Sequence, residues 1–243
     1  MLEILERASA RLPHDIERRL RVDPLSTVLR QATWGAHEEV ESGPLEDALA
    51  KGRLAVDVYA DLLAQSWAVY RALESLAPEL VHDPVAGAFV RPEVFRTQHV
   101  ERDLAHYWGP NWRSRVDLLP ATEFYVQRIE TVAAADPVAW IAHSYTRYLA
   151  DLSGGLLIDK AITAAYDLEQ DGRWLYTFDL GAGVDPKTWK NAYRQLLNVL
   201  DLDTATAVQL IEEALVVYQC NIALNDALVT RHGSIRSETS AVG

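Results

Sequence analysis

Residues 144–162, SYTRYLADLSGGLLIDKAI, have the apolar pattern of a long helix but carry two adjacent glycines in its middle. Each glycine destabilises a helix interior by about 1 kcal/mol relative to alanine. The presence of Gly154 and Gly155 in the predicted helix therefore requires an explanation. A helix face without side chains allows either a flat ligand or a second helix to lie directly against the backbone.

Helical spacing places a charged pair on the same face as the two glycines. Arg147, Asp151, Gly154 and Gly155 follow one another at the intervals that share one side of a helix. Taken alone, this face fits close helix packing beside an ordinary ion pair better than it fits a ligand site.

The rest of the chain has the same helical periodicity and predicts a single all-α domain of eight or nine helices. The linkers are short, and residues 171–186 form the main irregular connection. The predicted divisions are a helical N-terminal extension over 1–23, a domain over 24–232 and a flexible tail over 233–243. Helices are predicted to begin with Ser26 as N-cap, at Pro137 and Pro186, and at Asp203 or Thr204.

Composition narrows the class of protein. A net charge of -12 argues against broad binding to nucleic acid. Cys220 is the only cysteine, so no intrachain disulfide can form, which fits the cytoplasm. No apolar run approaches the roughly 18 residues of a membrane span, and the charged N-terminus lacks a secretory signal. The sequence leaves the oligomeric state open.

A second candidate group lies in LRQATWGAHEEVE, residues 29–41. Arg30, His37 and Glu41 share roughly one helix face. A carboxylate one turn from an imidazole can hold one ring nitrogen while the other binds a metal. A partly exposed histidine with an ion-pair neighbour explains the same pattern.

A third group is the like-charged pair Lys190 and Arg194, one turn apart in WKNAYRQLLN. Such a pair repels slightly unless an anion lies between the two side chains. Taken together, the three groups describe a site for a flat, apolar, dianionic ligand with a metal at its centre. Haem has these properties.

The string YTRYLADLSGG, residues 145–155, resembles the distal-helix signature of the biliverdin-producing haem oxygenases. The resemblance is to the bacterial, soluble members of that family. LRQATWGAHEEVE resembles their proximal-helix segment, and WKNAYRQLLN and EEALVVYQCNIAL resemble their C-terminal helices. The matches follow the family's order over about residues 24–230. The resemblance implies a helical bundle with haem between the proximal and distal helices.

The resemblance also implies a role for each matching residue. His37 would bind the haem iron, with Glu41 as the partner of its ring. Gly154 and Gly155 would let the distal helix bend close over the haem, while Asp151 would act through ordered water on the oxygen side. The water network would also involve Arg147 and Asn221, and the residues expected at the propionates are Arg30, Tyr145, Lys190 and Arg194.

The implied reaction opens haem, which is both cofactor and substrate, to biliverdin, carbon monoxide and ferrous iron. Dioxygen is the oxidant. The chain shows no flavin or nicotinamide fingerprint, so electrons would come from an external ferredoxin or NAD(P)H-dependent reductase. The sequence does not identify the donor, the biliverdin isomer or the physiological purpose.

Three positions depart from the family pattern. Ala150 stands where glycine is usual, and its methyl group would crowd the oxygen side. Leu156 replaces a usual glutamine, and Trp67 stands where a tyrosine of the distal network is expected. These departures support an alternative: a haem sensor, store or carrier of the same fold that does not cleave the ring.

Two further alternatives follow from other residues. A non-haem di-iron oxidase on a related bundle would need a cluster of carboxylates and histidines. Its candidate ligands are His99, Glu101 and His106, but their spacing does not correspond to a clear set of metal ligands. A hydrolase using Cys220 is the weakest alternative, because a lone cysteine on an apolar helix is usually a core residue.

Overall fold

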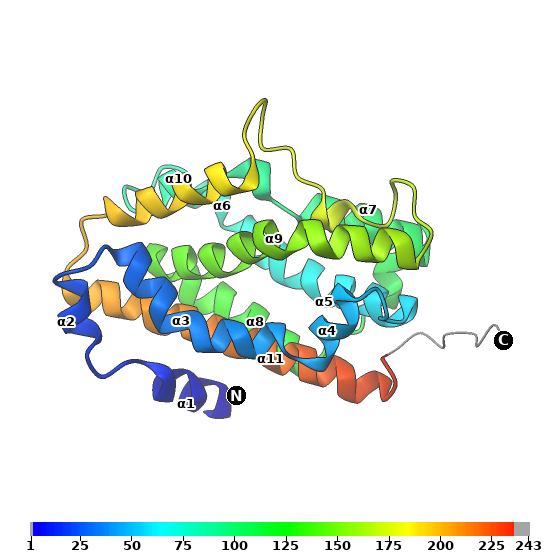
Figure 1. Cartoon of the computed structure of the whole chain (residues 1–243), viewed down its shortest axis with the longest axis horizontal. Helices are drawn as coiled ribbons and strands as arrows, with labels where there is room; N and C mark the ends of the chain where they lie inside the picture. Colours follow the sequence, from blue (N-terminus) through cyan, green and yellow to red (C-terminus); the bar gives the residue numbers. More distant parts are fainter. Residues whose placement is uncertain (1, 236–243) are drawn as a thin grey trace.

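The computed structural model describes residues 2–235, and every regular element in this range is helical (Figure 1). The α-helices are α1 (Leu2–Arg11), α2 (Ile16–Leu20), α3 (Leu25–Glu41), α4 (Pro44–Ala50), α5 (Val56–Ser75), α6 (Ala77–Leu80), α7 (Thr97–Trp108), α8 (Pro120–Arg128), α9 (Pro137–Ala165), α10 (Pro186–Asn198) and α11 (Thr204–His232). The short elements are η1 (Gly87–Phe89), η2 (Pro92–Val94), η3 (Trp112–Arg115), the π-helical turn η4 (Ile129–Ala133) and η5 (Trp174–Tyr176).

The prediction of a single all-α domain is confirmed. The described part of the chain has eleven α-helices, more than the eight or nine expected. Three of them, α2, α4 and α6, have only 5, 7 and 4 residues. Helices this short span too few turns to show the helical periodicity of apolar residues on which the sequence prediction depends.

Side-chain caps start α9, α10 and α11 at the expected places. Asp136 accepts a hydrogen bond from the backbone N–H of Val138, and Pro137 follows it at the first helical position. Asp185 and Asp203 cap α10 and α11 in the same way.

The prediction that Ser26 caps α3 is wrong. The N-cap is Pro24, two residues earlier, and the helix begins at Leu25 because Pro24 supplies the extended backbone that precedes it. The backbone N–H of Ser26, one of the groups that a helix start leaves without an intrahelical partner, donates instead to Asn198 Oδ1 at 3.0 Å. This bond fastens the start of α3 to the end of α10.

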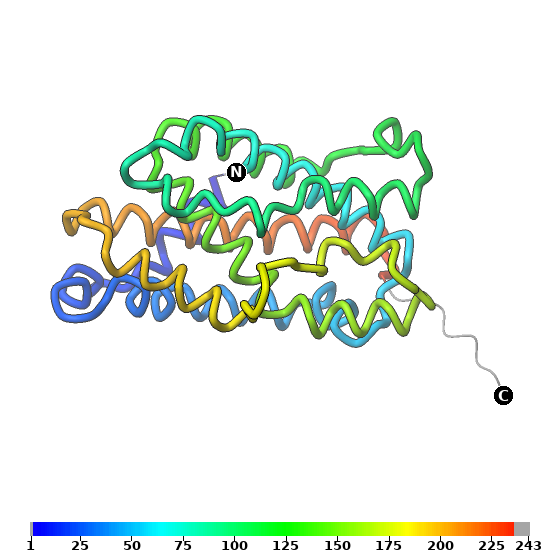
Figure 2. Tube along the Cα trace, turned by 90° about the horizontal axis from the view of Figure 1, so that it is seen from above, coloured from blue at the N-terminus to red at the C-terminus, as the bar shows by residue number. Residues whose placement is uncertain are grey.

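The long helices lie along the long axis of the molecule (Figures 1 and 2). In Figure 1, α3, α9 and α11 all run from left to right, whereas α5 and α10 run in the opposite direction. Helix α11 packs against α9, α1, α3 and α8. Because α3, α9 and α11 are parallel, residues late in each of them meet at the same end of the molecule.

The N-terminal segment forms α1 and α2, separated by a break at Pro13, and both helices pack on α11. At the other end, Ile235 is buried and its carbonyl accepts a hydrogen bond from the N–H of Ala55 at 2.8 Å. The start of the segment expected to be a flexible tail is thus held against the domain. Residues 236–243 lie outside the described residues.

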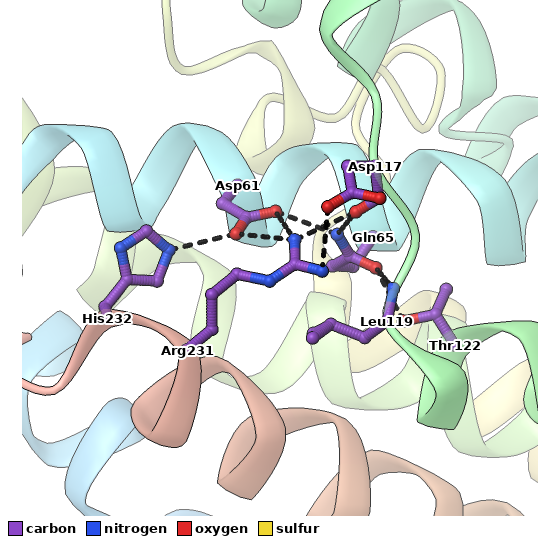
Figure 3. A network of polar contacts seen from close by, with 7 residues as sticks. All are labelled: Asp61, Gln65, Asp117, Leu119, Thr122, Arg231 and His232. Atoms are coloured by element: carbon purple, nitrogen blue, oxygen red, sulfur yellow. Dashed lines mark hydrogen bonds and ion pairs between the residues drawn. The ribbon is translucent and has the colours of Figure 1, made fainter.

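A polar network fastens the last turn of α11 to α5 (Figure 3). Asp61 accepts a hydrogen bond from Arg231 Nη1 at 3.2 Å and lies 2.9 Å from His232 Nε2. Gln65 donates to Asp61 at 2.8 Å and accepts from the hydroxyl of Thr122 at 2.7 Å. The network joins α5, α8 and α11 at one end of the bundle.

Helix α11 is long and apolar enough to cross a membrane by length and composition alone. In this fold, however, 67% of its most apolar window is buried inside the domain. We therefore interpret α11 as a core helix.

Candidate functional site

Two adjoining hollows lie beside α3, α9 and α11. The first, here called the glycine hollow, includes Glu41, Arg147, Asp151, Gly154, Gly155 and Asn221 in its lining. The second, here called the arginine hollow, includes Arg30, Tyr145, Ser153 and Arg194. His37, Thr146, Ala150 and Tyr218 line both of them. The structure therefore brings nearly all the predicted site residues to one continuous recess.

The two glycines of α9 have different surroundings, although the helix continues through both without interruption. A Cβ added to Gly154 would contact only Ile158 of the same helix, at 3.8 Å. A Cβ added to Gly155 would come within 3.3 Å of Tyr176 Cδ1. Gly154 therefore presents open backbone to the hollow, whereas Gly155 allows close packing of η5.

A partly buried polar network lies beside the glycines. The hydroxyl of Tyr70 donates a short hydrogen bond to Asp151, and Arg147 Nη1 donates to Asn221 Oδ1 at 3.1 Å. The guanidinium of Arg147 also lies 4.5 Å from the centroid of the Tyr70 ring. Burial raises the pKa of Asp151, against the opposing effects of Arg147 and the Tyr70 hydroxyl.

Tyr70 is a site residue that the sequence pattern did not reveal, and the prediction that Trp67 stands at the position of the distal-network tyrosine is wrong. The indole Nε1 of Trp67 donates to Glu101 at 3.1 Å, and its ring contacts Trp112. The hydroxyl expected to be absent is supplied by Tyr70, three residues further along α5. Leu156 also lies elsewhere, since it is 65% exposed and does not line either hollow.

His37, on α3, lines both hollows together with residues of α9. Its side chain is 25% exposed, and Nε2 lies 3.5 Å from Glu41 Oε1. The ring of Trp34 meets it edge-on at 5.2 Å. One ring nitrogen thus has a carboxylate neighbour, as expected for an imidazole that binds a metal through the other nitrogen.

The arginine hollow is basic. Within residues 2–235, Arg30 and Arg194 have no carboxylate at ion-pair distance, and Lys190 donates to Ser153 Oγ at 2.8 Å. Burial and the charge of Arg194 lower the pKa of Lys190. Cations without anionic partners fit a ligand that brings its own carboxylates.

Three observations test whether haem fits this recess. Gly154 leaves open backbone where a flat ring can lie, and the buried Nε of Arg147 has no hydrogen-bond partner in the described part of the chain. The recess is lined by a single imidazole, that of His37, and the arginine hollow holds two cations without carboxylate partners within residues 2–235. The residues present therefore fit a haem with its propionates toward the arginines.

The structure gives the other candidate chemistries no support. Within the described residues, no group of three or more His, Cys, Asp or Glu side chains can hold a metal ion. Glu101 pairs with Arg113, and burial lowers the pKa of His99 to about 4. Cys220 is buried, which raises the pKa of its thiol to about 12, so it is not a nucleophile.

Comparisons with known proteins agree with this geometry. A family model described as heme oxygenase matches residues 23–227. "Heme oxygenase 1" of Synechocystis sp. is 36% identical over 205 residues, which cover 84% of each protein. "Heme oxygenase 1" of Gallus gallus is 34% identical over 220 residues, covering 89% of this chain and 73% of that protein.

Solved structures with haem bound have the same fold. Heme oxygenase-1 from Synechocystis sp. in complex with heme matches with a TM-score of 0.79 and 33% identity, covering 87% of this chain and 96% of that one. Heme oxygenase-2 from the same organism, in complex with heme and NO, matches with a TM-score of 0.81 and 34% identity, covering 86% of each. Haem oxygenases are enzymes that degrade haem and require an electron donor. The fold, the recess and these relatives together establish that this chain belongs to the heme oxygenase family.

Proposed function

We propose that this chain binds haem in the recess through His37 and opens the porphyrin to biliverdin, carbon monoxide and ferrous iron. The observation that carries the proposal is that His37 of α3 lines one hollow with the open backbone of Gly154 and with Asp151, both of α9. Bound haem supplies the iron that reacts with dioxygen and is itself the molecule that is opened.

His37 holds the haem by binding its iron, and Glu41 keeps the imidazole in place. A neutral imidazole suits ring opening better than a thiolate does, since a thiolate favours cleavage of the O–O bond. Gly154 lets the ring lie close to α9, whereas a larger side chain there would keep it away. Ala150 narrows the same face, because it lines both hollows.

Asp151 orders water and passes protons on the α9 side of the ring. The hydroxyl of Tyr70 donates a hydrogen bond to its carboxyl, and the nearby charge of Arg147 favours the ionised form. Arg147 in turn donates a hydrogen bond to Asn221. Because burial raises the pKa of Asp151, its carboxyl takes up a proton more readily than an exposed one does. These residues act through water and do not remove protons from the porphyrin directly.

Arg30, Arg194, Lys190 and Tyr145 bind the propionates at the arginine hollow. The cations supply charge, and the phenol of Tyr145 supplies a hydrogen bond. Because both propionates lie on one side of the porphyrin, these contacts also set its rotation in the plane.

We further propose that electrons come from a ferredoxin or an NAD(P)H-dependent reductase, and that the chain is a bacterial, cytoplasmic member of the family. The similarity to cyanobacterial relatives and the single cysteine support this assignment. We also propose a domain over residues 24–232, with residues 1–23 as an added helical extension.

The test is single-turnover spectroscopy of the haem-loaded protein. Hemin is bound to the full chain, a reductant is added in air with catalase present, and the absorption spectrum is followed. The Soret band is expected to disappear while a biliverdin band grows in the red. His37→Ala is expected to abolish this conversion, since it removes the iron ligand.

His82→Ala is the matched control, because His82 is an exposed histidine outside both hollows. It should react as the wild type does. A Soret band that shifts on reduction but persists would contradict the proposal, and a haem sensor or carrier would then be the better description.

A further inference from the structure

The glycine hollow contains a polar group that the proposed reaction does not use. Glu46 on α4 and Asn225 on α11 line it together with Tyr176 of η5. Asn225 Nδ2 donates to Glu46 Oε1 at 3.3 Å. The Tyr176 hydroxyl lies in the electrostatic field of Glu46, which adds to the effect of burial in raising its pKa.

Glu46 has spare hydrogen-bonding capacity. Within residues 2–235 no cation lies at ion-pair distance from it, and the bond from Asn225 is the one hydrogen bond its carboxyl makes. A carboxylate can accept about four such bonds. Burial raises the pKa of Glu46, with Asp151 and Glu41 adding to the increase and Arg147 opposing it. A half-buried carboxyl with unused acceptor positions in the lining of a ligand pocket is suited to bind a polar atom of the ligand.

The position of this polar group relative to the arginine hollow determines which part of a ligand it can bind. His37 and Ala150 belong to both hollows, whereas Glu46 and Asn225 belong to the glycine hollow alone and Arg30 to the arginine hollow alone. In Figure 1, α4 and the late part of α11 lie toward one end of the molecule, and the later half of α10 lies toward the other. Glu46 therefore lies on the opposite side of His37 from the propionate-binding residues.

A haem held by its propionates at the arginine hollow would turn its opposite edge toward Glu46. That edge carries methyl and vinyl groups, which do not form hydrogen bonds. Opening the ring at the meso carbon of this edge creates two lactam carbonyl oxygens there. The polar group is thus mismatched to the substrate but complementary to the oxygenated product.

We propose that Glu46, Asn225 and Tyr176 form a product subsite that hydrogen-bonds the lactam groups of biliverdin opened opposite its propionates, which is the IXα isomer. This inference rests on the proposed function. The Asn225 amide and the Tyr176 hydroxyl donate to lactam oxygens, and Glu46 bonds to a lactam N–H or, when protonated, to an oxygen.

The test is equilibrium binding of purified biliverdin IXα and of haem, each measured separately, to the full apo-protein. Glu46→Leu is expected to weaken biliverdin IXα binding about tenfold, which corresponds to the loss of one hydrogen bond. Haem binding should remain equal to or tighter than that of the wild type. Glu46→Gln, which keeps the hydrogen bonds, should retain most of the biliverdin affinity.

Two comparisons separate a product subsite from a general effect on the pocket. Biliverdin IXγ, opened on the propionate side, should bind Glu46→Leu and the wild type equally. Glu38→Leu removes a carboxylate at an exposed position on α3 that lines neither hollow. This substitution should leave the affinities for haem and for biliverdin IXα unchanged.

The inference is overturned if Glu46→Leu weakens haem and biliverdin IXα together, or weakens neither. Should that variant not fold, Asn225→Leu is measured in the same way and has the same expected outcome. Because ligand binding is measured without turnover, this result is independent of whether the wild type opens haem.

Discussion

At the scale of single residues, Gly154 and Gly155 show how adjacent identical residues can serve different ends. Gly154 faces open space, and Gly155 faces the ring of Tyr176. Under the proposed function the first glycine serves the ligand, whereas the second allows the close packing of η5 on α9. The two requirements can be separated by experiment.

Gly154→Ala is expected to stabilise the apo-protein by about 0.5–1 kcal/mol, because alanine favours the helix and its Cβ meets no obstacle. The same methyl group would project toward the haem and is expected to weaken haem binding about tenfold, a typical effect of overpacking. Urea denaturation and haem titration measure the two effects.

Gly155→Ala is the matched comparison. Its Cβ would lie 3.3 Å from Tyr176, so part of the gain in helix stability should be cancelled by the close contact. Gly155→Ala should therefore stabilise the apo-protein less than Gly154→Ala does. Equal stabilisation by both substitutions, with unchanged haem affinity, would show that neither glycine serves the ligand.

Helical spacing alone predicted which residues share the face of α9, and the structure brings them to one hollow. The same reasoning could not find Tyr70, because its partner Asp151 is 81 residues away and lies on another helix. Glu46 and Asn225 are 179 residues apart and were missed for the same reason. Spacing relates residues within one helix, whereas contacts between helices depend on tertiary packing.

At the scale of elements, α7 positions η5 over α9. Both carboxyl oxygens of the fully buried Asp103 accept backbone N–H groups at 2.8 Å, one from Trp174 and one from Leu175. Arg96 donates to the carbonyl of Thr177, also at 2.8 Å. These bonds hold the segment that presents Tyr176 to the glycine hollow.

Asp103→Asn is expected to release η5, since the amide can accept only one of the two N–H bonds. The cost should be about 1–3 kcal/mol, the effect of leaving a buried donor unpaired. Hydrogen exchange of the Trp174 and Leu175 amides should become faster, while amides in α11 keep their protection. Unchanged exchange at these two positions would show that Asp103 does not hold η5.

The titration of Asp103 gives this substitution a second signature. Burial raises its pKa from 3.8 to about 6, against the lowering effect of the two N–H groups. Because the folded-state pKa is the higher one, the stability this group contributes is present below pH 4 and is lost as pH rises through 6. That part of the pH dependence should be absent from Asp103→Asn.

At the scale of the whole molecule, an ion cluster joins α8, α9 and α11. Glu213 accepts hydrogen bonds from Arg128 at 2.8 Å and 2.5 Å and lies 2.9 Å from His143 Nε2. Burial alone would raise the pKa of Glu213, but the bonds from His143 and Arg128 lower it to about 2. The cluster therefore favours the ionised carboxylate in the folded state.

Glu213→Gln is expected to lower the free energy of unfolding at pH 7 by about 3 kcal/mol, because it leaves the mostly buried guanidinium of Arg128 without its counter-charge. The folded-state pKa of Glu213 lies below the ordinary value of 4.5, so its contribution is present above pH 4.5 and is lost as pH falls toward 2. The difference from the wild type should shrink accordingly in urea denaturation at pH 3.

Glu212→Gln is the control for this prediction, since it changes an exposed carboxylate at the neighbouring position. Its stability should match that of the wild type at both pH values. A constant difference between Glu213→Gln and the wild type at pH 7 and pH 3 would show that the ionisation of Glu213 is not linked to folding.

The single thiol has a practical consequence for biochemical work on the molecule. Cys220 is fully buried, and its raised pKa leaves almost no thiolate near neutral pH. Purification and assays therefore do not need dithiothreitol or a similar thiol, which can itself reduce haem iron and promote non-enzymatic porphyrin oxidation in air. A cysteine introduced on the surface would also be the one reactive site for a fluorophore or spin label, without first removing a native cysteine.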